Sequence, residues 1–163
     1  MNTLQVTTPS DREIAMTRVF DAPRQLVYDA HTKPELVRQW LLGPPGWTMP
    51  VCDMDVRVGG TYRWVWRRDT DQSTMGMGGV YREVVAPERI VATEKFDDAW
   101  YPGEGLNTLV LVEHGGRTTL TQTMRYESRE ARDAVLKTGM QEGVTAGYAR
   151  LDALLASARQ AAR

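Results

Sequence analysis

Residues 139–158, GMQEGVTAGYARLDALLASA, predict the long amphipathic helix on which the fold depends. At about 100° per residue, one face of this helix collects its apolar residues, which are Met140, Val144, Tyr148, Leu151, Leu154, Leu155 and Ala158. Gly143 and Gly147 share that face, one turn apart, and each costs roughly 1 kcal/mol relative to alanine. Two explanations stay open: the glycines let a sheet approach closely, or they leave room for a ligand between helix and sheet.

Seven strands are predicted from alternating apolar and polar residues between turn residues. Two short helices lie between the first strand and the second, one capped by Asp21 with Pro23 at its start and one beginning at Thr32 and Pro34. Ser128 is the predicted N-cap of another short helix. The strands are residues 12–20, 49–57, 61–68, 75–85, 89–96, 106–114 and 117–127, and the short helices are residues 21–31, 32–41 and 128–137.

Six successive strands joined by tight turns favour an antiparallel meander, which must bury one of its faces. The helix at residues 139–158 is the long amphipathic element that can cover this face. We therefore predict an α+β fold in which a curved antiparallel sheet of about seven strands wraps around the C-terminal helix.

Length and charge indicate one domain and exclude several classes of partner. A chain of 163 residues can bury about 70% of its unfolded surface without disulfides or metal. Twenty basic and 21 acidic residues give a net charge of −1, and the basic residues are scattered. We therefore expect neither nucleic acid nor a membrane surface as a partner.

The cellular location is predicted from cysteine content and from the N-terminus. The single cysteine, Cys52, excludes an internal disulfide and suits a reducing compartment. The N-terminus lacks a hydrophobic signal core, and no apolar run approaches the roughly 20 residues of a membrane span. We expect a cytoplasmic protein with a flexible segment at residues 1–11, one domain at 12–158 and a tail at 159–163.

Several ordered motifs carry a resemblance to a known family. They are RVFDAP at 18–23, KPEL at 33–36 with Trp40, DVRVGGTYRW at 55–64, GVYREV at 79–84 with PERIV at 87–91, TTLT at 118–121 and GMQEG at 139–143. Together, over about residues 12–156, they resemble the activator of heat-shock protein 90 ATPase homologue-like family. That family is a branch of the helix-grip (SRPBCC) superfamily of START lipid-transfer domains and birch-pollen-allergen-like proteins.

The resemblance implies a cavity between sheet and helix, but it implies no single chemistry. Members of the family include carriers, polyketide cyclase-like proteins and chaperone regulators. The resemblance to the eukaryotic chaperone activator covers only its C-terminal domain, so we expect the domain that drives ATPase stimulation to be missing here. The family name therefore does not state the activity of this protein.

Aromatic residues and methionines are the candidates for lining a ligand site. Tyr62, Trp64 and Trp66 share one face of the strand at 61–68. Large rings with a polar atom suit ligand sites, although each ring taken singly also suits an ordinary core. The predicted ligand-binding residues are Trp40, Tyr62, Trp64, Trp66, Met77, Tyr81, Trp100, Met124, Met140, Gly143, Gly147 and Tyr148.

Acid–base chemistry would rest on Glu83 and Glu94, which lie on neighbouring strands, with Tyr62 and Tyr81 as proton donors. A carboxyl group buried there would have a raised pKa. Strand parity leaves the direction of both side chains open, and each could instead pair with a nearby arginine or lysine on the exposed face. We therefore assign no catalytic residue.

The sequence predicts no metal and no cofactor. The soft ligand candidates His31, Cys52 and His114 are far apart in the chain. We interpret His31 as stabilised by a helix end and His114 as a polar turn residue. Phosphate-binding, dinucleotide-binding and nucleophile-elbow motifs are missing from the sequence.

Three functional hypotheses follow. The first is a binding protein, without enzymatic activity, for a small hydrophobic molecule that is aromatic or lipid-like. The second is an enzyme of the polyketide cyclase, dehydratase or lyase type that orients a substrate in the same cavity. The third is a module that interacts with heat-shock protein 90. The sequence leaves open the ligand and whether two copies form a homodimer.

Overall fold

The computed structural model describes residues 2–99 and 101–161. In chain order, the elements of these residues are β1 (Gln5–Thr7), β2 (Glu13–Phe20), α1 (Arg24–Thr32), α2 (Pro34–Trp40), β3 (Trp47–Met54), β4 (Thr61–Arg68), β5 (Thr74–Val85), β6 (Arg89–Phe96), β7 (Gly105–His114), β8 (Arg117–Arg125), α3 (Arg129–Leu136) and α4 (Met140–Ala161). No helix in the two described ranges is both long and apolar enough to cross a membrane.

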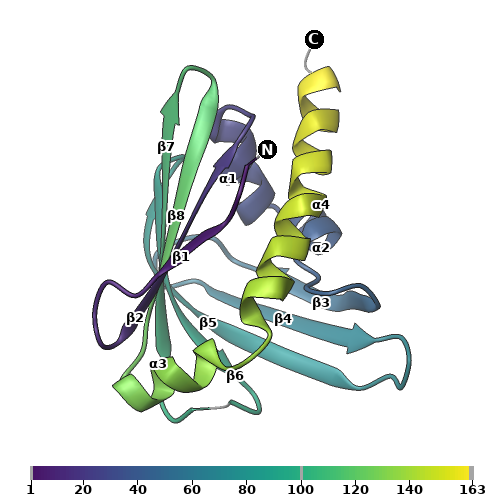
Figure 1. The fold of residues 1–163 in the computed structure, drawn as a ribbon. Coiled ribbons are helices and arrows are strands. Elements are labelled where there is room, and N and C mark those ends of the chain that lie inside the picture. Colours follow the sequence, from purple (N-terminus) through teal and green to yellow (C-terminus); the bar gives the residue numbers. More distant parts are fainter. Residues whose placement is uncertain (1, 100, 162–163) are drawn as a thin grey trace.

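The strands form one antiparallel sheet in the order β1-β2-β8-β7-β6-β5-β4-β3. Figure 1 shows the curved sheet facing α4, with α1 and α2 near the same helix and α3 below its first turn. This architecture confirms the predicted helix-grip fold. It also places the concave face of the sheet opposite the apolar side of α4, where Tyr148, Leu151 and Leu155 are buried.

The ends of the chain differ from the sequence prediction. Residues 5–7, expected to be flexible, form β1 and pair with β2. Three residues are too few to show a strand period, and β1 depends on tertiary contacts with the core, which its own residue Val6 and the preceding Leu4 make. Helix α4 extends to Ala161, so residues 159–161 of the predicted tail are helical. The last two residues lie outside the described chain.

One predicted helix cap is wrong and another is confirmed. The N-cap position of α1 is Pro23, which offers no capping side chain. Asp21 instead accepts a hydrogen bond from Arg117 Nε at 2.8 Å. The hydroxyl of Ser128 accepts a hydrogen bond from the backbone N–H of Ala131 at 3.1 Å and caps α3 as predicted.

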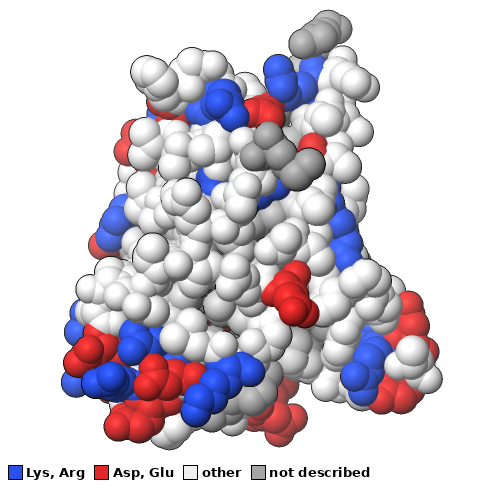
Figure 2. All heavy atoms as spheres, in the orientation of Figure 1, with Lys and Arg blue, Asp and Glu red and all other residues white. Residues whose placement is uncertain are grey.

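Buried apolar residues form two clusters. The larger includes Phe20, Trp40 and Tyr148 and joins α1, α2 and α4 to the sheet. The smaller includes Met124 and Tyr126 and lies against α3. In the face shown by Figure 2, charged side chains gather at the lower edge and at the tip of the β4–β5 hairpin, whereas the middle is largely uncharged.

Candidate ligand-binding site

A cavity of about 580 Å³ lies between α4 and the concave face of the sheet. Its walls include members of both apolar clusters, such as Trp40 and Tyr62 from the larger and Met124 and Tyr126 from the smaller. The cavity therefore lies where the two clusters would otherwise meet. Its size and its mainly apolar lining are typical of sites for small organic molecules.

The aromatic face of β4 forms one wall. The ring centroids of Tyr62 and Trp64 are 4.7 Å apart, and those of Trp64 and Trp66 are 6.1 Å apart. Trp66 Nε1 donates to the carbonyl of Leu41 at 2.7 Å, so its ring is held against the end of α2. Alternation along the strand explains why all three rings point the same way.

The residues predicted to bind ligand come together. Trp100 lies outside the described residues, and each of the others lines the cavity, namely Trp40, Tyr62, Trp64, Trp66, Met77, Tyr81, Met124, Met140, Gly143, Gly147 and Tyr148. They come from five separate elements, β4, β5, β8, α2 and α4. Their convergence in space is a structural finding, whereas their role in binding stays a prediction.

The two glycines of α4 face the cavity, but the sheet is not what approaches them. A Cβ added at Gly147 would lie 3.3 Å from the carbonyl oxygen of Trp40, at the end of α2. A Cβ at Gly143 would lie 3.6 Å from Pro44 Cδ, an ordinary van der Waals distance. Gly147 thus permits a close helix–helix contact, while Gly143 lies beside the loop after α2 without a tight contact.

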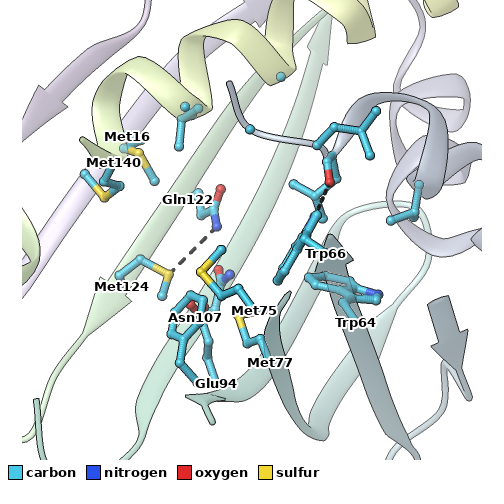
Figure 3. Close-up of a pocket in the computed structure, with 18 of the residues that line it drawn as sticks. Met16, Trp64, Trp66, Met75, Met77, Glu94, Asn107, Gln122, Met124 and Met140 are labelled. Carbon is cyan, nitrogen blue, oxygen red and sulfur yellow. Dashed lines mark hydrogen bonds between the residues drawn. The ribbon is translucent and has the colours of Figure 1, made fainter. Parts of the chain in front are cut away.

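Sequence reasoning missed several lining residues. Figure 3 shows Met16 beside the predicted methionines, together with the polar side chains of Gln122 and Asn107. Asn107 lies on β7 at an inward position, opposite Ala92 on one neighbouring strand and Met124 on the other. The sequence signal that could have identified Asn107 was a polar residue at an inward-facing position of a strand. Tyr101, in the loop before β7, offered no periodic pattern.

A β-bulge decides the direction of Glu83. The register between β5 and β6 shifts between Tyr81 and Glu83, so these residues point to opposite faces although they are two positions apart. Tyr81 lines the cavity. Glu83 is exposed and accepts a hydrogen bond from Arg89 Nε at 2.7 Å, the surface pairing considered as its alternative. Glu83 is therefore not part of the site.

Glu94 on β6 points inward and lines the cavity with only 8% of its surface exposed. It pairs with Gly105 on β7, two positions from Asn107, so Glu94 and Asn107 are diagonal neighbours on the same face. Figure 3 shows both side chains at one end of the cavity. Burial raises the pKa of Glu94 to about 7, and the neighbouring Asn107 amide opposes this shift.

Other ionisable groups of the cavity stay neutral near pH 7. Burial lowers the pKa of His31 to about 4, and its Nδ1 lies 2.7 Å from the carbonyl oxygen of Val27. His31 lies in the last turn of α1 and its ring contacts a carbonyl of that helix, as the prediction of a helix-end contact requires, but the ring is neutral near pH 7 and so gains nothing there as a cation. Burial raises the pKa of Tyr101 to about 12 and also raises those of Tyr62 and Tyr126.

Metal chemistry has no support among the described residues, which contain no group of three or more histidine, cysteine or acidic side chains able to hold an ion. Cys52 is buried and free. Its thiol has a raised pKa because of burial, as expected of a small core residue rather than a nucleophile.

With the cavity described, the comparison with known proteins settles the family. The model of the family described as "Activator of Hsp90 ATPase homolog 1-like protein" matches residues 21–156. The chain belongs to this family. This is the family that the motifs of the sequence resembled, so the family assignment is confirmed. A search of curated proteins found no match.

Solved structures agree with this assignment. A protein from Rhodobacter sphaeroides is 32% identical, with a TM-score of 0.88 over 94% of this chain and 98% of that one. A Mycobacterium smegmatis protein is 25% identical, with a TM-score of 0.82 over 94% and 97% of the two chains. A Chromobacterium violaceum protein is 29% identical, with a TM-score of 0.76 over 88% and 96%.

Proposed function

We propose that this protein binds a small hydrophobic molecule, with an aromatic or other apolar body, in the cavity between α4 and the sheet. The observation that carries the proposal is the cavity of about 580 Å³ walled by aromatic rings and methionines. A void of this size removes packing from the centre of the fold, and an apolar ligand would restore the lost contacts. Methionines suit this role because their flexible side chains adapt to different shapes.

The hydrogen bonds of the walls support a site that exists before the ligand arrives. Trp40 Nε1 donates to the carbonyl of Ala30 at 2.8 Å, and Tyr62 OH donates to the carbonyl of Thr93 at 2.7 Å. These bonds fix the rings without any ligand. Binding to such walls would involve little loss of side-chain entropy.

An enzyme of the polyketide cyclase, dehydratase or lyase type is the second candidate, and Glu94 is the observation that favours it. A buried carboxyl group with a pKa of about 7 can accept and return a proton near neutral pH. Under this alternative, Glu94→Gln would abolish turnover while the substrate still bound.

A cytoplasmic location, and the lack of nucleic-acid and membrane partners, remain predictions.

Native mass spectrometry of freshly purified protein tests the proposal. We expect an additional mass of a small organic molecule that is released on denaturation. A matched pair of variants locates it: Ala92→Trp fills the cavity, whereas Ala15→Trp places the same ring on the other face of the sheet. The mass should disappear from the first variant and persist in the second. Equal retention by both variants would contradict binding in the cavity.

A further inference from the structure

The polar groups of the cavity gather at one end and belong to three neighbouring segments. Glu94 lies on β6, Asn107 on β7 and Tyr101 in the loop between them. Tyr101 has 5% of its surface exposed, and its ring packs edge-on against the ring of Tyr126, with the centroids 5.1 Å apart. Both the Tyr101 hydroxyl and Asn107 Oδ1 are buried without a hydrogen-bond partner. A ligand group at this end would meet polar atoms that the protein leaves unsatisfied.

Asn107 Oδ1 is a hydrogen-bond acceptor, and the Tyr101 hydroxyl can both donate and accept. Several other donors of the cavity walls are already used within the protein. The hydroxyls of Tyr62 and Tyr148 donate to Thr93 O and Gln122 Oε1. Gln122 Nε2 donates to Met124 Sδ, as the dashed line in Figure 3 shows.

Among the described residues, Trp64 Nε1 is a further buried donor without a partner. In Figure 3 this nitrogen lies on the side of the ring away from Glu94 and Asn107. The polar end therefore offers the Glu94 carboxylate and Asn107 Oδ1 as acceptors, beside the Tyr101 hydroxyl, which can also accept, and a ligand that supplies donors complements these groups.

The charge of the cavity also favours a ligand that supplies hydrogen-bond donors. Among the described residues that line it, Glu94 is the acidic one and none is lysine or arginine. None of the ion pairs of the described chain includes Glu94. A buried carboxylate is costly unless a cation is near, and a negatively charged ligand such as a fatty acid would add a second anion.

The surrounding rings favour a cation as well. Tyr101, Tyr126 and Tyr62 are near enough to Glu94 for its charge to raise the pKa of each. Aromatic faces attract ammonium groups, and the attraction is stronger when water is excluded. An unsatisfied acceptor, a buried carboxyl group without an ion pair among the described residues and the neighbouring aromatic rings together suit a protonated amine.

We infer that the ligand is a hydrophobic amine whose protonated nitrogen lies between Glu94, Asn107 and Tyr101, while its apolar body extends along the wall formed by β4. This inference rests on the proposed binding function and narrows the ligand class. It separates amines from neutral alcohols and from carboxylic acids of the same size.

Isothermal titration calorimetry with three probes that share one naphthalene body tests the inference. The probes are 2-naphthylmethylamine, 2-naphthylmethanol and 2-naphthoic acid. At pH 8 we expect the amine to bind at least tenfold more tightly than the alcohol, and the acid to bind most weakly. Glu94→Gln should remove the preference for the amine, whereas Glu83→Gln, on the exposed face, should keep it. Urea unfolding of both variants checks that they fold.

The pH dependence provides an independent readout. The amine stays protonated between pH 6 and 8, while Glu94 ionises over this range. The tyrosines around Glu94 and the neutral His31 do not titrate there. Affinity for the amine should therefore rise about tenfold from pH 6 to pH 8, because the fraction of ionised carboxylate rises by that factor.

The other outcomes of these experiments would overturn either the inference about amines alone or the inference together with the proposed function. Equal binding of amine and alcohol, or an amine affinity that falls as pH rises, would overturn the inference and leave the proposed cavity function standing. Persistence of the amine preference in Glu94→Gln would also overturn it. Failure of all three probes to bind would count against the inference and the proposed function together.

Discussion

The guanidinium of Arg18 on β2 donates two hydrogen bonds to the carboxylate of Asp152 on α4, at 2.7 and 2.5 Å. Arg18 is 8% exposed, and its charge lies 4.6 Å from the centroid of the Phe20 ring. The cavity removes apolar packing between α4 and the sheet, so direct links such as this pair carry more of the attachment of the helix. Arg18 is not among the cavity-lining residues, and the pair leaves the ligand space free of cations.

Removal of Asp152 should loosen this link. Asp152→Ala leaves the buried Arg18 guanidinium without its carboxylate, and we expect a loss of about 2 kcal/mol in the free energy of unfolding. Asp133→Ala is the matched control, because Asp133 is equally exposed and also bonds a buried arginine. That arginine, Arg132, keeps the carbonyl oxygens of Ser10 and Glu13 as acceptors. Urea unfolding should show less than half the effect in the control, and equal losses would contradict this account.

The two helical glycines should respond differently to alanine. Gly143→Ala makes only ordinary contacts and should raise the free energy of unfolding by about 0.5–1 kcal/mol through helix propensity. Gly147→Ala pushes against the Trp40 carbonyl oxygen, which the backbone N–H of Leu42 holds in place. We expect this variant to lose about 0.5–1 kcal/mol. Urea unfolding measures both variants. An equal gain in the free energy of unfolding would contradict this account, because it would show that the end of α2 moves aside at no cost.

Glu94 should make stability depend on pH. Its pKa is raised from 4.5 to about 7 in the folded state, so the folded protein binds this proton more tightly than the unfolded chain. Stability is therefore highest at low pH and falls as pH rises toward 7. Between pH 5 and 8, wild type should lose about 2.5 kcal/mol relative to Glu94→Gln. Urea unfolding across this range checks it, and parallel curves for the two proteins would refute a buried, unpaired carboxyl group.

The sequence predicted those parts of the site that regular periods control. Alternation in β4 placed three rings on one face, and helical spacing placed Gly143, Gly147 and Tyr148 on the inner side of α4. It could not predict the direction of Glu83, because a β-bulge interrupts the period of β5. It also could not predict the contact between Arg18 and Asp152, because these residues are 134 positions apart in the chain.

Long-range contacts also explain the remaining differences. Strand β1 is too short to show a pattern, and what approaches Gly147 is the end of α2 rather than the sheet. The polar end of the cavity depends on the register that joins Ala92 to Asn107. Such a register is set by pairing across the sheet, which one sequence does not display.

The central claim is that the cavity between α4 and the sheet holds a small hydrophobic molecule. N-phenyl-1-naphthylamine, which is uncharged near neutral pH and fluoresces strongly in apolar surroundings, probes this claim independently of the inference about amines. Ala92 lies between Tyr81 and Asn107 on the cavity floor, so a tryptophan there projects into the bound probe.

The decisive measurement is a fluorescence titration of this probe with wild type, Ala92→Trp and the outer-face control Ala15→Trp. We predict saturable binding to wild type. The affinity of Ala92→Trp should be at least tenfold lower, which is a loss of about 1.4 kcal/mol or more in binding free energy. The affinity of Ala15→Trp should lie within threefold of wild type. Binding of similar affinity to all three proteins, with both variants folded, would contradict the claim.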